Sequence, residues 1–166
     1  MINIRKARET DFDDIWKIFH AIVEAGETYA YSPQTTKEQA FKIWMAPYVT
    51  TYVADEDGTI LGTYILKRNQ PALGAHVANA SYMVSPKAQG RGVGKAMGKH
   101  SLEEAKRAGY RAMQFNLVVS TNQAAIALWK DLGFSIIGTL PKAFNHKKLG
   151  FVDAHVMYRF LEAGGD

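Results

Sequence analysis

The chain has 166 residues, of which 47% are hydrophobic and 22% are charged, and it carries a formal net charge of +4. This length suits one globular domain, which buries about two-thirds of the surface of its unfolded chain. Cys is absent, which excludes disulfides, thiolate metal sites and a Cys nucleophile. No apolar run reaches the ~18 residues that span a bilayer, and the first residues lack a secretory signal, so we expect a cytoplasmic protein with no membrane partner.

The amino-terminal segment predicts one strand followed by one helix. Alternating apolar residues indicate a strand over residues 1–7. Thr10 is placed to cap a helix from Asp11 to about Ala25, because apolar residues recur on one face of this segment. Gly26 can end that helix in a left-handed conformation.

A second helix and three strands follow. Thr36 and Gln39 have the spacing of a capping box and predict a short helix that stops before Pro47. Residues 50–68 predict a β-hairpin, because two β-rich runs flank the turn sequence Asp-Glu-Asp-Gly. Residues 76–84 predict a further strand of alternating pattern.

The second half predicts two helices and three strands. Both helices are followed by a glycine that can end them. In chain order the segments are a helix over 93–108, a strand over 111–119, a helix over 121–132, and strands over 134–140 and 153–161. We therefore expect a mixed α/β sheet with helices packed on it, in one domain over residues 1–166.

A glycine-rich loop leads into the first of these helices at residues 85–100, SPKAQGRGVGKAMGKH. It does not match the Walker loop, because Gln89 stands where that pattern needs its first Gly and Ala96 where it needs Ser or Thr. It does not match the dinucleotide-binding pattern either, because Lys95 or Met97 takes the place of the last Gly. What remains is the sequence Q-x-x-G-x-G.

This Q-x-x-G-x-G sequence, built on Gln89, Gly92 and Gly94, can bind an anion. Glycines leave no Cβ beside the backbone, so several N–H groups can point at one phosphate, and the following helix adds its positive end. A plain strand-to-helix turn is the alternative. Cations gather beside the loop and favour a phosphate-bearing ligand over nucleic acid; they are Lys87, Arg91, Lys95 and Lys99.

The loop resembles the acyl-CoA-binding motif of the GCN5-related N-acetyltransferases. Residues 115–134, FNLVVSTNQAAIALWKDLGF, are similar to that family's strand-then-helix segment, in which an Asn opens a helix that ends in a Leu-Gly-Phe-like triplet. Together the two motifs cover about residues 82–134 in the family's order. The resemblance implies an α/β (α+β) fold: a mixed, mostly antiparallel sheet of about seven strands with its fourth and fifth strands splayed apart, flanked by about four helices.

The resemblance also implies acetyl-CoA as cosubstrate and no metal. The backbone of Tyr82, Met83 and Val84 would pair with the pantetheine arm, and an N–H there, assigned to Val84, would face the thioester carbonyl. Asn122 would contact the pantetheine region, with an ordinary helix N-cap as the alternative. The loop residues expected to bind the cofactor are Gln89, Gly90, Arg91, Gly92, Val93, Gly94 and Lys95.

The implied reaction is direct transfer of acetyl from acetyl-CoA to an amine in a ternary complex. Many relatives carry a Tyr that can protonate the leaving thiolate, but Trp129 stands at that position here, so we assign no catalytic acid. Glu27 could take the amine proton through water, with a surface glutamate as the alternative. His76 and His155 have a smaller claim as bases.

Asn79 and Asn116 indicate the acceptor side, because Asn is depleted inside strands. Hydrogen-bonded core amides are the simpler explanation. Residues 76–84 and 115–122, however, resemble the fungal acetyltransferases of proline analogues such as azetidine-2-carboxylate, in which the matching asparagines contact or orient the substrate. Residues 143–160 resemble the phosphinothricin and methionine-sulfoximine acetyltransferases. We therefore expect a small amino-acid-like amine as acceptor.

Two other functions stay open at this stage. The acceptor could be a protein N-terminus or lysine, drawn by the acidic stretch at residues 55–57. The chain could also be a non-catalytic acetyl-CoA sensor or partner-binding module, which Trp129 makes conceivable. Tyr29 and Tyr31 are candidates for the acceptor mouth, with packing on the fold as the alternative. A homodimer is expected by analogy with the family.

Overall fold

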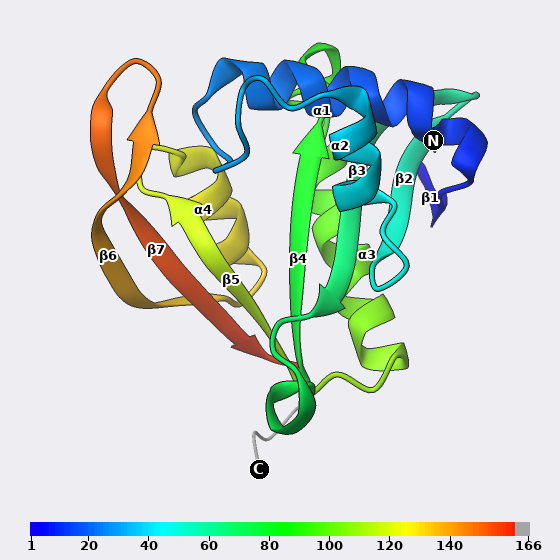
Figure 1. Cartoon of the computed structure of the whole chain (residues 1–166). Coiled ribbons are helices and arrows are strands. Elements are labelled where there is room, and N and C mark those ends of the chain that lie inside the picture. Colours follow the sequence, from blue (N-terminus) through cyan, green and yellow to red (C-terminus); the bar gives the residue numbers. More distant parts are fainter. Residues whose placement is uncertain (162–166) are drawn as a thin grey trace.

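The computed structural model describes residues 1–161 and contains a seven-stranded sheet with helices on both faces (Figure 1). The strand order is β1-β2-β3-β4-β5-β7-β6, and only β4 and β5 pair in parallel. The predicted mixed, mostly antiparallel sheet is confirmed. In chain order the elements are β1 (Asn3–Lys6), α1 (Phe12–Ala25), α2 (Lys37–Trp44), β2 (Thr50–Glu56), β3 (Thr59–Arg68), β4 (Val77–Val84), α3 (Val93–Arg107), β5 (Ala112–Val119), α4 (Gln123–Asp131), β6 (Ser135–His146) and β7 (Gly150–Phe160).

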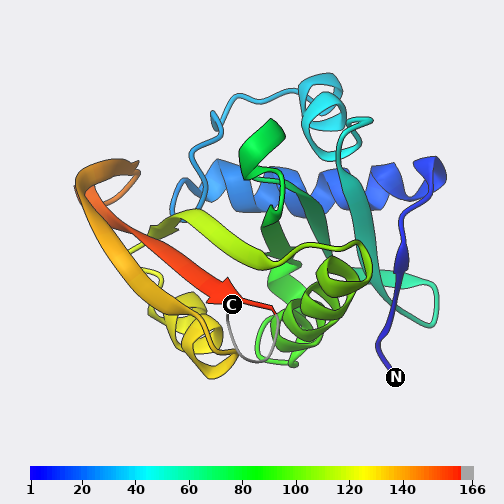
Figure 2. The same ribbon diagram turned by 90° about the horizontal axis from the view of Figure 1, so that it is seen from below.

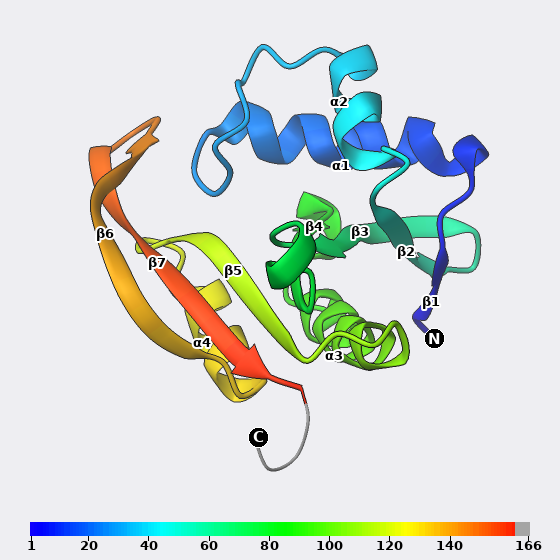
Figure 3. The same cartoon turned by 60° about the horizontal axis from the view of Figure 1, so that its bottom comes forward.

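Each face of the sheet has its own buried core. In Figures 2 and 3, α1 and α2 lie on one side of the sheet, while α3 and α4 lie on the other. Phe19 of α1 and Trp44 of α2 pack with Met83 of β4 on the first face. Met97 of α3 and Trp129 of α4 pack on the second. No helix within residues 1–161 is long and apolar enough to cross a membrane.

The start of α1 differs from the prediction. A short 3-10 turn over Glu9–Asp11 precedes the helix, which begins at Phe12 rather than Asp11. The Asp11 carboxylate, and not Thr10, accepts the backbone N–H of Arg8, at 2.6 Å. The same carboxylate accepts two N–H groups of Arg5 from β1, at 2.8 and 2.9 Å. The Asp11 side chain makes no cap hydrogen bond to α1; its carboxylate instead joins strand and turn through charge-assisted hydrogen bonds.

The other predicted helix ends in the first half are confirmed. Gly26 has φ 65° at the end of α1. Thr36 and Gln39 form a reciprocal capping box at the start of α2, with the Gln39 N–H donating to Thr36 Oγ1 at 3.2 Å. The β2–β3 hairpin turns at Asp57 and Gly58, both of which have positive φ.

The last two strands are longer than predicted. β6 extends to His146, and β7 begins at Gly150, whereas the sequence pattern indicated strands over 134–140 and 153–161. The β6–β7 register shifts between Leu140 and Phe144, and Lys142 has φ 50° within that bulge. A bulge breaks the two-residue alternation, so the strand continues where its pattern stops.

The expected splay of β4 and β5 is present. The two strands pair only at Val77–Ala112 and Ala78–Met113. Beyond these pairs β5 leaves β4 but stays paired with β7, and Figure 1 shows β4 and β5 opening into a V. The glycine-rich loop and the start of α3 follow the end of β4, at the open side of this V.

Gly62 of β3 fixes how closely α3 approaches the sheet. A Cβ at this position would lie 2.9 Å from Met97 Cε, 3.0 Å from Val93 Cγ1 and 3.1 Å from the Met83 carbonyl oxygen. Only a glycine therefore allows the first turn of α3 to pack directly on β3 and β4.

We expect Gly62→Val to lower the free energy of unfolding by about 1–3 kcal/mol, because its side chain overpacks the contact between β3 and α3. Thr59→Val, at the exposed start of the same strand, serves as the control and should change stability by less than about 0.5 kcal/mol. Urea unfolding of both variants measures the difference. Equal stabilities for the two variants would contradict this role for Gly62.

Candidate active site

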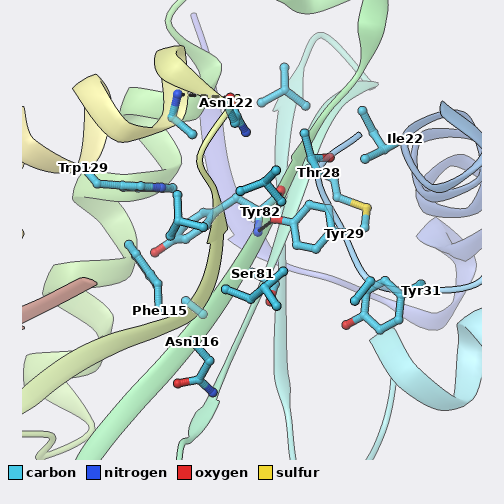
Figure 4. A pocket seen from close by; sticks show the side chains of 18 of the residues that line it. Ile22, Thr28, Tyr29, Tyr31, Ser81, Tyr82, Phe115, Asn116, Asn122 and Trp129 are labelled. Carbon is cyan, nitrogen blue, oxygen red and sulfur yellow. Dashed lines mark hydrogen bonds between the residues drawn. The ribbon is translucent and has the colours of Figure 1, made fainter. Parts of the chain in front are cut away.

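A cavity of about 410 Å³ occupies the splay between β4 and β5 (Figure 4). Its walls come from both strands, from the loop after α1, and from α4. Tyr29 and Tyr31 line it, as expected from the sequence, and so does Trp129. Among residues 1–161, no Asp, Glu, Lys, Arg or His side chain lines this cavity.

The cavity has two chemically different ends. Figure 4 shows Asn122 at one end and Asn116 at the other. Val84 and Gln89 also line the cavity and connect it to the glycine-rich loop. Asn79 and Asn116 both line the cavity, and they come from the two strands that diverge. A ligand bound at the glycine-rich loop can therefore extend between β4 and β5 toward the two asparagines.

Backbone directions alternate along β4, so residues of opposite parity face its two edges. The Ser85 N–H, just after the strand, donates to the Leu61 carbonyl of β3 at 2.8 Å. Tyr82 turns the other way, into the cavity, where its N–H donates to the Tyr29 hydroxyl at 2.9 Å. That hydroxyl in turn donates to the Tyr82 carbonyl. Val84 has the parity of Tyr82, so its N–H and C=O also face the cavity.

This alternation bears on two of the predicted cofactor contacts. The backbone groups of Met83 face β3, and its buried side chain reaches the cavity wall, so Met83 offers apolar surface to the splay rather than backbone hydrogen bonds. Both backbone groups of Tyr82 are bound to the Tyr29 hydroxyl. Burial raises the pKa of the Tyr29 phenol, which therefore stays protonated near neutral pH and can both donate and accept. Of the three residues predicted to pair with the pantetheine arm, Val84 fits best, because its backbone groups face the cavity.

The glycine-rich loop has the shape of an anion site. Gly90 and Gly92 have φ 78° and 79°, and a Cβ on either would meet no atom within 4 Å. α3 begins at Val93, so its first backbone N–H groups and its positive end adjoin the loop. Two of the four cations beside the loop form ion pairs: Arg91 with Glu56, and Lys95 with Asp131 at 2.7 Å. The backbone N–H groups of the loop therefore remain a candidate anion-binding group beside these side chains.

Asn122 and Trp129 each have a structural role as well as a place at the cavity. The Asn122 side chain accepts the Ala125 N–H at 3.3 Å, which confirms the N-cap interpretation. Trp129 is buried and packs against Tyr82 and Phe115, with ring centroids 4.7 Å apart in both pairs. Trp129 therefore belongs to the core as well as to the cavity wall.

Asn79 and Asn116 meet through a residue that the sequence analysis missed. Asn69 Oδ1 accepts Asn79 Nδ2 at 3.3 Å and Asn116 Nδ2 at 2.7 Å. Gln114 Nε2 also donates to Asn116 Oδ1, at 2.9 Å. Asn69 follows the last residue of β3 in the sequence Asn-Gln-Pro, which is typical of a loop, so the sequence contained no signal for this contact.

The predicted bases do not lie in the cavity. The Glu27 carboxylate forms an ion pair with Lys148 at 2.7 Å, which lowers the Glu27 pKa and makes this carboxylate a weaker base. His155 Nδ1 is hydrogen-bonded to Thr139 Oγ1 at 2.9 Å, and His76 is exposed. None of the three belongs to the cavity lining, so the geometry does not support a base role for them. Within the described residues, no group of three or more His, Asp or Glu could hold a metal ion.

Comparison with known proteins identifies the family. The sequence model of the acetyltransferase (GNAT) family matches residues 12–134. The chain belongs to this family. N-acetyltransferase aca1 of Schizosaccharomyces pombe is 31% identical to this GNAT protein over 156 residues, which cover 83% of this chain and 75% of that protein. The expectation of an acetyltransferase is confirmed.

Solved GNAT structures have the same fold. A GCN5-related N-acetyltransferase from Kribbella flavida is 49% identical with a TM-score of 0.92, covering 96% of this chain and 97% of its own. A phosphinothricin acetyltransferase from Sinorhizobium meliloti, solved in complex with AcCoA, is 24% identical with a TM-score of 0.82, covering 96% of this chain and 88% of its own. At that lower identity the likeness shows the fold alone.

We expect Gly92→Val to weaken acetyl-CoA binding about tenfold or more, because the new side chain fills the open space that a phosphate needs. Gly109→Val is the matched control, since Gly109 also has positive φ, 87°, with open space around it, but lies at the far end of α3. Both variants carry similar backbone strain. Calorimetry should show weaker binding only for Gly92→Val, and equal affinities would contradict the anion site.

Proposed function

We propose that this protein transfers acetyl from acetyl-CoA to the amino group of a small amino-acid-like acceptor, by direct attack in a ternary complex. The observation that carries the proposal is the cavity in the splay, which joins a backbone anion site at one end to uncharged amides at the other. Such a cavity can hold donor and acceptor end to end. Proximity and orientation then supply much of the rate enhancement, without a covalent intermediate on the protein.

The residues present fit acetyl-CoA. The backbone N–H groups from Gly90 to Lys95 would hold the pyrophosphate. The C=O of Val84 would accept from the pantetheine arm, and its N–H would donate to the thioester carbonyl and polarise it. Gln89 and Asn122 line the path between these two positions. When bound, acetyl-CoA supplies an activated acyl group on a thiol with a pKa near ~8.5, which leaves without full protonation.

The acceptor end favours a small polar amine. Asn79 and Asn116 offer amide donors and acceptors without charge, which suit the carboxylate and amino groups of an amino-acid-like molecule. The cavity volume of about 410 Å³ is in the range of small-molecule sites.

The structure supports a basic peptide acceptor less well than a small amine. The acidic stretch that could draw such a peptide belongs to the β2–β3 turn. Asp55 is committed there, since its Oδ2 accepts Arg5 at 3.1 Å and its Oδ1 accepts the Gly58 N–H at 2.9 Å. These contacts hold the hairpin, so the acidity of the stretch has a structural explanation.

The test of the function is thiol release from acetyl-CoA with a panel of acceptors: free amino acids, proline analogues, phosphinothricin, methionine sulfone, polyamines and short peptides. We expect turnover with at least one small amino acid. Turnover only with peptides would contradict the acceptor class. Tight acetyl-CoA binding with no turnover on any amine would contradict the enzymatic function.

Asn116→Ala should lower kcat/KM for the best acceptor about tenfold to a hundredfold while leaving acetyl-CoA affinity nearly intact, because only the acceptor end of the cavity changes. Asn3→Ala, an exposed strand residue on β1, is the matched control and should leave both quantities unchanged. Steady-state kinetics with calorimetry separates the two effects. An unchanged acceptor rate would mean that Asn116 has only a structural role.

The pH dependence of kcat/KM should be set by the amine pKa of the acceptor and not by a group on the protein. Within residues 1–161 no carboxylate, Lys or His lines the cavity, and burial raises the pKa of its tyrosines, which stay protonated, so the amine must enter in its neutral form. Below the acceptor's own pKa, kcat/KM should rise about tenfold per pH unit, since only the neutral amine attacks. Profiles with two acceptors of different amine pKa check this. An inflection at the same pH for both would reveal a base on the protein.

A further inference from the structure

Asn69 joins the two diverging strands at the point where their backbone pairing stops. The last paired residues are Ala78 and Met113, and Asn79 follows Ala78 directly on β4. Beyond this point Tyr82 of β4 still packs against Phe115 of β5, and one side-chain oxygen bridges the polar groups of the two strands. Asn69 Oδ1 accepts Asn79 Nδ2 at 3.3 Å from β4 and Asn116 Nδ2 at 2.7 Å from β5.

The Asn69 backbone is itself anchored. Its N–H donates to the Val77 carbonyl at 2.8 Å, which extends the β3–β4 ladder by one residue. A side chain on a fixed backbone places its oxygen reproducibly. An amide oxygen has two lone pairs, so accepting two N–H groups uses its whole capacity and fixes which way both partner amides turn.

Asn69 does not line the cavity, whereas both of its partners do. Any effect of Asn69 on the acceptor must therefore pass through Asn79 and Asn116. Asn69 accepts one N–H from each of these two side-chain amides, so neither amide rotates freely. The remaining N–H and C=O groups of Asn79 and Asn116 therefore have fixed directions. Preorganised polar groups bind a ligand without paying the cost of ordering them first.

We propose that Asn69 is a positioning residue that sets the spacing and orientation of Asn79 and Asn116, and thereby the recognition of the acceptor. The inference rests on the proposed function, because it assigns these two asparagines to the acceptor end of the cavity. It adds the residue that follows β3 to an acceptor end whose two asparagines come from β4 and β5. Without the Asn69 oxygen, both amides lose a shared partner and are free to turn.

The test compares three variants by steady-state kinetics with the best acceptor. Asn69→Ala removes the bridge and should lower kcat/KM for the acceptor about tenfold, mainly through KM, with the KM for acetyl-CoA unchanged. Asn69→Asp keeps two acceptor oxygens and should restore activity to within about threefold of the unmodified protein. Gln70→Ala, the exposed neighbour outside the cavity lining, should have no effect.

A second readout separates positioning from folding. Adding Asn69→Ala to Asn116→Ala should cost less than the product of the two single effects, because both changes break the same contact. Full additivity, or an Asn69→Ala variant that behaves like Gln70→Ala, would overturn the inference. So would an equal rise in the KM for acetyl-CoA, which would indicate general loosening of the sheet.

Failure of the inference is distinguishable from failure of the proposed function. If the unmodified protein turns over small amines and Asn69→Ala is equally active, only the inference fails. If the unmodified protein acetylates no small amine, the acceptor assignment fails and the inference falls with it. In that case the side-chain amide signals of Asn79 and Asn116 in NMR spectra should still shift in Asn69→Ala, and unchanged signals would show that the bridge itself is absent in solution.

Discussion

The divergence of β4 from β5 leaves an unpaired strand edge inside the protein, and the site is built around that edge. Backbone N–H and C=O groups that face a cavity need partners, because burying them unpaired costs free energy. The Tyr29 hydroxyl satisfies both groups of Tyr82. Val84, one step further along the same edge, presents its groups where the cavity meets the glycine-rich loop. The same edge of β4 thus needs an internal hydrogen-bond partner at Tyr82 and can offer hydrogen bonds to a ligand at Val84.

The proposed anion site and the proposed reaction centre lie close together because one short segment carries both. β4 ends at Val84, and α3 begins at Val93 after the glycine-rich loop. Gly62 lets α3 pack tightly on β3, which holds the loop at the open side of the splay. At the closed side, Asn69 links the strands through Asn79 and Asn116. The cavity is therefore held at both ends, which favours a fixed distance between the donor and acceptor positions.

Local sequence patterns predicted the element order, the capping box at Thr36 and the glycine-rich loop, because each depends on neighbouring residues. Three features of the structure could not be predicted from local patterns. The bulge around Lys142 hid the continuation of β6, because it breaks the alternation. The direction of the Met83 backbone depends on which edge of β4 meets β3. Asn69 and Asn116 are distant in the chain, and no local sequence pattern around either residue indicates that the two are in contact.

The most direct test of the account is the backbone amide NMR spectrum with and without acetyl-CoA. If acetyl-CoA binds in the splay, we expect the backbone amide signals of Val84, Gly92 and Gly94 to shift strongly on binding. The amide signal of Met83, whose N–H faces β3, should shift much less. Shifts centred instead on the opposite ends of α3 and α4, with Val84 and the glycine-rich loop unaffected, would contradict the claim that the splay of β4 and β5 is the site of acetyl transfer.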